Sequence, residues 1–72
     1  MIDMKLSARN QIKGKVVKVT NGMVSSEIVI DIGNGQQIVS VITKTSAESL
    51  NLAVGKEVYA VIKSSEVLVA VE

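Results

Sequence analysis

Short runs of alternating apolar and polar residues, separated by polar or glycine-containing turns, fill most of this 72-residue chain. The alternation predicts strands over residues 11–20, 23–32 and 37–43, because successive side chains of a strand point to opposite faces. Two shorter apolar runs predict strands over residues 57–62 and 67–71. The many valine and isoleucine residues support this assignment, since β-branched side chains favour strands.

The breaks between the first three runs have the composition of hairpin turns. Asn21-Gly22 is a strong hairpin signal, because both residues tolerate a positive φ. A second hairpin turn is predicted at residues 33–35, which read Gly-Asn-Gly. Gly14 interrupts the first strand, and a glycine inside a strand is typical of a bulge or bend. Such a bend would help a small sheet to curl.

A short helix is predicted between the third and fourth strands. Thr45 and Glu48 fit a capping box, in which the threonine caps the first turn and the glutamate reaches back to it. The helix extends to about Leu52, with Leu50 and Leu52 turned toward the core, and Gly55 lets the chain turn out.

The order of three strands, one helix and two strands predicts an all-β fold. We expect a five-stranded OB-like Greek-key barrel, with the helix between strands 3 and 4; an SH3-like barrel is the alternative. Residues 1–72 are expected to form one domain, with residues 1–5 frayed. A chain of this length buries roughly 60% of its unfolded surface. The third strand is apolar on its second face too, at Val39 and Val41, which predicts a partner subunit.

Composition narrows the classes of function. The chain has no cysteine and no histidine, so we expect neither catalysis nor a metal ion held directly by protein ligands. Tyr59 is the sole aromatic residue and the formal net charge is +1, which disfavours oligonucleotide binding. The apolar runs are short and no signal-peptide pattern is present. We therefore expect a cytoplasmic protein without nucleic-acid or membrane partners.

Three groups of hydrogen-bond donors remain as candidate binding chemistry. They are Ser7, Arg9 and Asn10 near the N-terminus, Thr43 and Ser46 at the predicted helix start, and Lys63, Ser64 and Ser65 before the last strand. Arg9 carries a rigid fork of N–H donors that stays charged near neutral pH. No carboxylate lies over residues 7–26. Such donors suit a small anion that accepts hydrogen bonds and donates none.

Four segments in a fixed order add a family resemblance. They read SARNQ at residues 7–11, KGKVV at 13–17, VIT at 41–43 and VIKSS at 61–65. With these segments the chain resembles the molbindins, the single-domain members of the Mop (TOBE-like) molybdate-binding family. The resemblance extends over residues 6–71.

This resemblance implies an OB-like barrel that assembles as a homohexamer, a trimer of dimers. It implies that molybdate or tungstate binds at the subunit interfaces, for intracellular molybdate storage or homeostasis. Its motifs and the donor groups together give the expected ligand-binding residues: Ser7, Arg9, Asn10, Thr43, Ser46, Lys63, Ser64 and Ser65. Two alternatives stay open, an oligonucleotide-binding OB module and a purely structural oligomerisation domain.

Overall fold

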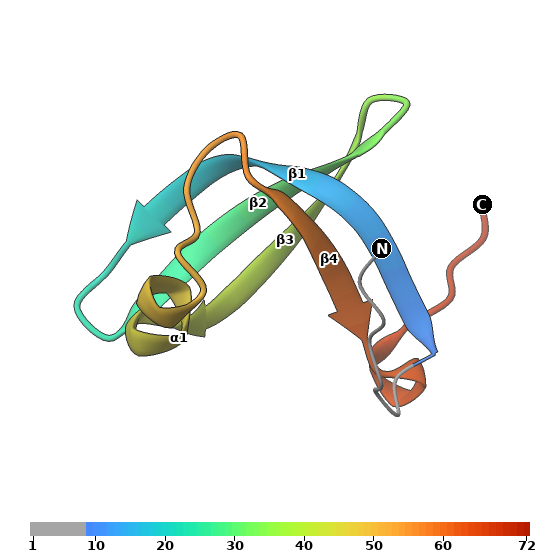
Figure 1. Cartoon of the computed structure of the whole chain (residues 1–72). Coiled ribbons are helices and arrows are strands. Elements are labelled where there is room, and N and C mark those ends of the chain that lie inside the picture. The colour runs from blue at the N-terminus through green and yellow to red at the C-terminus, as the bar shows by residue number, and fades with distance from the viewer. Residues whose placement is uncertain (1–8) are drawn as a thin grey trace.

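The computed structural model describes residues 9–72, which form one antiparallel sheet, a short α-helix and a 3-10 turn (Figure 1). The strands are β1 (Asn10–Asn21), β2 (Ser25–Gly33), β3 (Gln36–Thr43) and β4 (Glu57–Ile62). Helix α1 (Lys44–Ser49) lies between β3 and β4, and the 3-10 turn η1 (Ser64–Glu66) follows β4. The all-β class and the position of the helix after the third strand are therefore confirmed.

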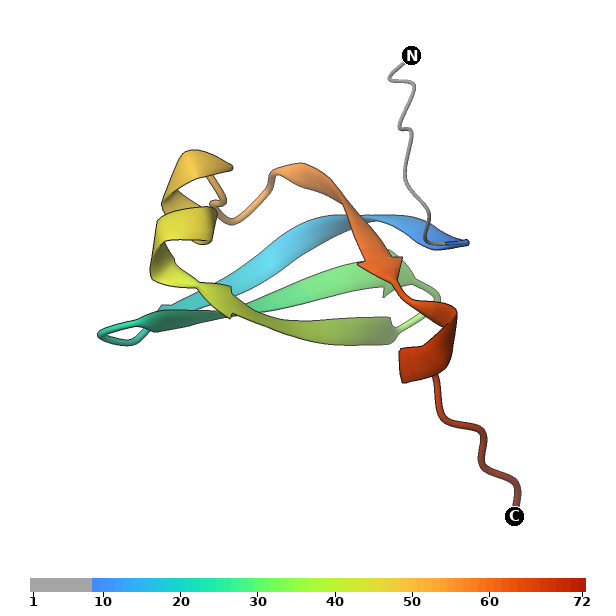
Figure 2. The same cartoon turned by 90° about the horizontal axis from the view of Figure 1, so that it is seen from below.

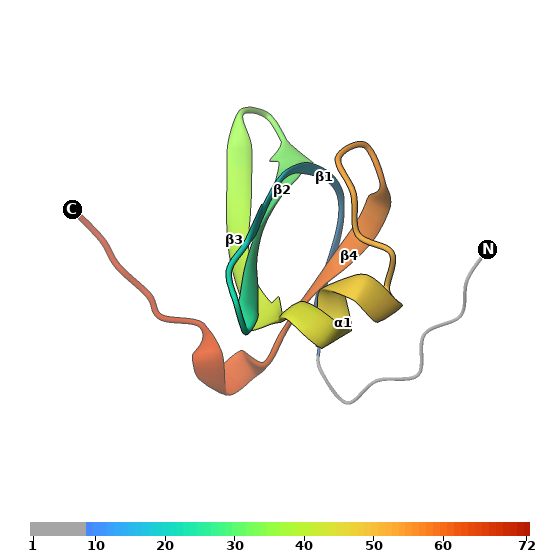
Figure 3. The same ribbon diagram turned by 90° about the vertical axis from the view of Figure 1, so that its left-hand side faces the viewer.

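The sheet curls because β1 pairs with two different strands along its length. Residues 10–15 of β1 pair with β4, and residues 15–21 pair with β2 on the other edge. The strand order is β3-β2-β1-β4, which leaves β3 and β4 as the two edge strands. Figure 3 looks along this curl, which brings β3 and β4 round toward each other without pairing them.

Two local features allow β1 to bend between its partners. The register with β2 shifts between Val16 and Lys18, so the bulge lies one residue after Val16 and not at Gly14. Gly14 has a different role, because an added Cβ there would lie 2.6 Å from the Ile30 Cγ2 and 2.7 Å from the Asp31 carbonyl oxygen. The glycine therefore permits a close approach of β2 that a side chain would prevent.

The hydrophobic core lies inside the curl. Its buried members are Val16, Ile28, Ile30 and Ala60, against which Leu52 and several partly buried β-branched residues pack. The predicted inward position of Leu52 is confirmed. Leu50 is 56% exposed, so its predicted inward position is wrong, because the helix ends at Ser49 and Leu50 is already the cap residue.

The predicted fifth strand is not formed by this single chain. After η1, residues 67–72 run away from the sheet as a tail, as Figure 2 shows, and pair with none of the four strands. Their apolar side chains are open to solvent: Leu68 is 93% exposed, Val69 90% and Val71 94%. The five-stranded form of the barrel is therefore not confirmed.

We expect Gly14→Ala to lower the free energy of unfolding by about 1–3 kcal/mol, the usual range for forcing atoms into a packed site. Backbone atoms of Asp31 form part of the obstruction, so a rotamer change would not relieve it. Thermal unfolding followed by circular dichroism measures the effect. Gly22→Ala serves as the comparison and should cost less, since its new Cβ would meet its nearest atom, the Ser25 carbonyl oxygen, at 3.1 Å, a tight contact but a looser one than at Gly14. Equal stability of wild type and Gly14→Ala would contradict the close approach.

Candidate functional site

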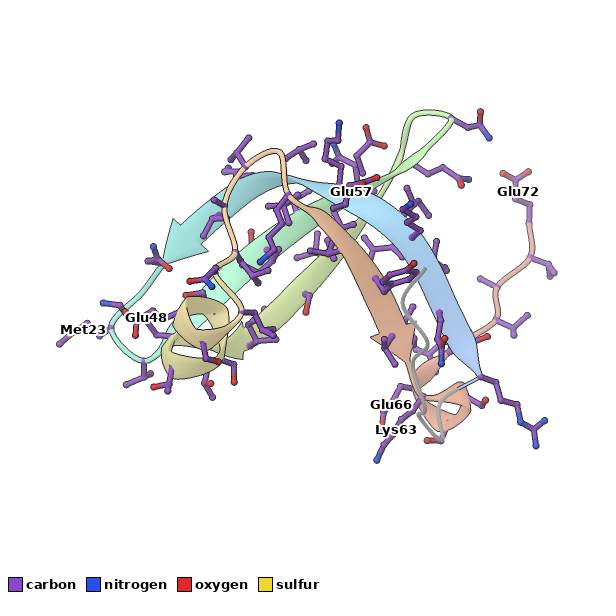
Figure 4. All side chains as sticks on the ribbon, in the orientation of Figure 1. Met23, Glu48, Glu57, Lys63, Glu66 and Glu72 are labelled. Atoms are coloured by element: carbon purple, nitrogen blue, oxygen red, sulfur yellow. The ribbon has the colours of Figure 1, made fainter. Side chains whose placement is uncertain are left out.

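The structure brings two of the three predicted donor groups to one end of the sheet. Asn10 at the start of β1 pairs with Ile62 at the end of β4. Beyond this pair, the antiparallel geometry places Arg9 and Lys63 as the next residues on the two neighbouring chains. Figure 4 shows Lys63 at this end, beside η1. Two cationic residues that lie far apart in sequence thus flank the same end of the sheet, and we call this the cationic end of the sheet.

Ser64 and Ser65 extend the cationic end, because they form the first two residues of η1 directly after Lys63. Both serines are exposed. Within residues 9–72, neither of their hydroxyls has a hydrogen-bond partner in the chain. Ser7, the remaining member of the first predicted group, lies outside the described residues. The cationic end therefore offers two cations and two free hydroxyls.

The third donor group is built around the start of α1. Thr43, the last residue of β3, is the N-cap: its Oγ1 accepts a hydrogen bond from the Ser46 N–H at 3.1 Å and donates one to the Ser46 Oγ at 2.8 Å. The prediction that Thr45 caps the helix is wrong. The helix begins at Lys44, so the cap position falls on the strand residue before it.

This third group lies at the opposite end of β1 from the cationic end. Thr43 pairs with Ser25 at the start of β2, which continues the β2 ladder beyond the Ser26–Asn21 pair. Asn21 and Asn10 are the two ends of β1, and a strand of this length spans roughly 35 Å when extended. Figure 1 shows α1 and the end of β4 at the two ends of the sheet. A single chain therefore does not bring all three donor groups together.

The two cations of the cationic end form no ion pair within residues 9–72. Among residues 9–72 the one ion pair joins the Lys13 ammonium to the Glu57 carboxylate at 3.6 Å, and both side chains are largely exposed. Arg9 and Lys63 take no part in an ion pair within the described residues. The same part of the chain has no cluster of three or more metal-ligating side chains. The cationic end therefore offers hydrogen-bond donors from two cations and two hydroxyls, with the carboxylate of Glu66 in the same turn η1.

A second feature, which the sequence pattern did not indicate, is an apolar groove of about 530 Å³ between the two sheet edges. Its walls come mainly from β3 and β4, and include Ile38, Ile42, Val58 and Ala60. None of the predicted donor residues lines it. The groove therefore lies between the two unpaired edges of the sheet, β3 and β4.

Fold and site together define a small all-β domain that presents donors at strand ends and holds no cluster for a metal in its described residues. The TOBE domain model matches residues 6–69. A probable molybdenum-pterin-binding protein of Haemophilus influenzae is 52% identical over 69 residues, which cover 96% of this chain and all of that protein. Molybdenum-pterin-binding protein 3 of Clostridium pasteurianum is 47% identical and covers 92% of this chain and 97% of its own length.

Solved structures agree with the sequence relatives. MopII from Clostridium pasteurianum superposes with a TM-score of 0.87 at 43% identity, over 93% of this chain and 100% of that chain. A molybdate binding protein from Sporomusa ovata superposes with the same TM-score at 36% identity, over 93% of this chain and 98% of that chain. A molybdate-bound form of the cytoplasmic protein ModG gives 0.80 at 49% identity, over 85% of this chain and 43% of ModG. The chain belongs to the TOBE-domain family and to its Mop group. These relatives are described as molybdenum-pterin-binding, molybdate-binding or molybdenum transport proteins.

We expect Thr43→Val to lower stability by about 1 kcal/mol, the usual cost of removing an N-cap hydroxyl. Valine keeps the shape and strand preference of threonine, so the loss reports the cap and not β3. Thr45→Val is the matched control and should change stability little. Urea unfolding at equilibrium measures both variants, and a larger loss from Thr45→Val would restore the predicted capping box.

Proposed function

We propose that this protein binds molybdate, and also tungstate, at sites formed between copies of the chain. The observation that carries the proposal is the cationic end, where Arg9 and Lys63 flank the last β1–β4 pair and the free hydroxyls of Ser64 and Ser65 follow Lys63. Relatives of the same length are described as molybdenum-pterin-binding or molybdate-binding proteins, which supports the same ligand here.

The donor chemistry fits this anion. Molybdate near neutral pH is a tetrahedral dianion without protons, so its oxygens accept hydrogen bonds and donate none. Guanidinium, ammonium and hydroxyl groups supply the matching donors. Phosphate is partly protonated near pH 7 and requires an acceptor as well. Sulfate has the same charge as molybdate but is smaller, so cavity size would reject it. Nothing in the donor set separates tungstate from molybdate.

The separation of the donor groups supports a site between subunits. Thr43 and Ser46 lie at the far end of the sheet from Arg9 and Lys63 in the same chain. A second copy that brings its helix end to the cationic end would complete a site from Arg9, Asn10, Thr43, Ser46, Lys63, Ser64 and Ser65, with Ser7 two residues before Arg9 in the sequence. Binding would then need the assembled protein, for which we propose a homohexamer built as a trimer of dimers.

The exposed apolar surface supports self-association independently of the anion. Val39 and Val41 lie on the outer face of β3 and are 58% and 67% exposed. The apolar tail of residues 67–71 is equally unprotected, and the groove between β3 and β4 has free strand edges on both sides. We propose that the tail of one copy enters the groove of another as the fifth strand. The tail leads away from its own sheet (Figure 2), which favours exchange over closure within one chain.

The role we propose is binding without catalysis, as a cytoplasmic store or buffer of molybdate, by one domain spanning residues 1–72. The two alternative functions, oligonucleotide binding and purely structural oligomerisation, require other features. An oligonucleotide-binding module would use aromatic platforms, and Tyr59 is the sole aromatic side chain. A purely structural oligomerisation domain would leave the free donors of the cationic end without a partner.

Isothermal titration calorimetry with four anions and a short single-stranded oligonucleotide tests the function. We expect molybdate and tungstate to bind, sulfate and phosphate to bind far more weakly, and the oligonucleotide not to bind. Equal affinity for sulfate would contradict a cavity matched to the larger anions. Binding of the oligonucleotide alone would favour the OB-module alternative.

Variants connect this binding to the cationic end. Arg9→Ala and Lys63→Ala should each weaken molybdate binding by about 2–4 kcal/mol, the range for removing one partner of a desolvated charge pair. Both residues are exposed in the single chain and outside the core, so folding should persist. Lys18→Ala removes an exposed cation from the middle of the sheet and is the matched control. A variant of Arg9 or Lys63 with full affinity would exclude that residue from the site.

A last expectation joins binding to assembly. If the anion binds the oligomer and not the free chain, molybdate at about a hundred times its dissociation constant stabilises the assembled form by roughly 2.7 kcal/mol per site. Sedimentation velocity over a dilution series, with and without molybdate, should show dissociation at a lower protein concentration when the anion is present. Full-strength binding by a monomer would place the site within one subunit.

Removal of residues 67–72 tests the exchanged strand in the same measurement. The buried core includes no residue of the tail, so the shortened chain should fold and sediment as a smaller species. Met23→Ser, which replaces an equally exposed apolar residue at the tip of the β1–β2 hairpin, should leave the assembly intact. An unchanged oligomer after truncation would contradict the exchange.

A further inference from the structure

Glu66 is a carboxylate in the same turn as Lys63, and the proposed function gives it no role. Its backbone N–H donates a hydrogen bond to the Lys63 carbonyl oxygen at 2.9 Å. This bond closes the 3-10 turn η1, whose N-cap is Lys63 and whose last residue is Glu66, so the two residues lie at the two ends of one turn. Figure 4 shows Lys63 and Glu66 next to each other at this end of the molecule.

Neither charge is otherwise engaged. Within residues 9–72, Lys63 and Glu66 form no ion pair with each other or with a third residue. Both side chains are exposed. The two residues nevertheless belong to one turn, closed by the backbone bond between them, and charges interact over roughly 8–10 Å at physiological salt. An anion that approaches Lys63 therefore meets a fixed negative charge as well.

We infer that Glu66 competes with the bound oxyanion for the Lys63 ammonium, and so lowers the affinity of the site and speeds release. The inference rests on the proposed function and specifies how its affinity is set. A dianion beside a carboxylate is repelled by the carboxylate's negative charge, and the carboxylate offers no hydrogen-bond donor in return. When the anion leaves, Glu66 remains as the local counter-charge of Lys63. A site that carries its own competitor binds reversibly, as a buffer requires.

Removing the negative charge without changing the shape of the side chain tests this. We expect Glu66→Gln to bind molybdate about three- to tenfold more tightly, as expected for one like charge near a partly screened dianion. Stopped-flow release should slow by a similar factor. Glu66→Asp retains the charge and should stay close to wild type. Glu72→Gln makes the same charge change at the exposed end of the tail, and should leave the affinity unchanged.

A double variant shows whether Glu66 acts through Lys63. In a Lys63→Met background, Glu66→Gln should increase the affinity for molybdate much less, because the ammonium for which Glu66 competes is absent. Unchanged or weaker binding by Glu66→Gln would overturn the inference, and so would an equal gain from Glu72→Gln or an undiminished gain without Lys63. These results differ from failure of the proposed function, in which wild type itself would bind no molybdate.

Discussion

The structure depends on one strand that must pair with two neighbours in succession. The first half of β1 pairs with β4 and its second half pairs with β2. A flat β1 could not bring these two neighbours round to enclose a core. The missing side chain at Gly14 and the bulge after Val16 provide the bend. At the bend, the backbone of Val16 also bonds with the loop before β4, at Gly55 and Lys56. The core and both donor-bearing ends of the sheet follow from that curvature.

The same curl leaves the domain incomplete. The edge strands β3 and β4 flank an apolar groove but do not pair with each other. The apolar residues 67–71, which could fill this gap, are exposed to solvent. Unpaired edges and exposed apolar segments are the features through which β proteins associate with other copies. Self-association would therefore protect the edges and bury the tail in one step. It would also bring together donor groups that a single chain keeps apart.

The polar chemistry of the protein is simple for a physical reason. Without histidine or cysteine, selectivity has to come from fixed charges, hydroxyls and the size of the space between them. The ladder pairing of Asn10 with Ile62 brings Arg9 and Lys63 together, and the turn that continues from Lys63 supplies the hydroxyls. That turn also carries Glu66, so attraction and repulsion toward an anion arise from neighbouring positions of one short segment.

The sequence by itself determined the all-β class, the first four strands, the hairpins and the residues with donor chemistry, because strand periodicity and side-chain type are local properties. It also determined membership of the Mop group, through motifs that need no geometry to be read.

The sequence failed to predict features that depend on residues distant in the chain. The helix cap fell on Thr43 instead of Thr45 because β3 runs directly into the helix. Leu50 stayed outside the buried core because α1 ended before it. Residues 67–71 have the composition of a strand, but a strand requires a neighbouring edge, and in a single chain the tertiary structure carries them away from it. The tertiary structure likewise decided which donors meet, because the pairing of β1 with β4 unites Arg9 and Lys63, while the length of β1 separates them from Thr43 and Ser46.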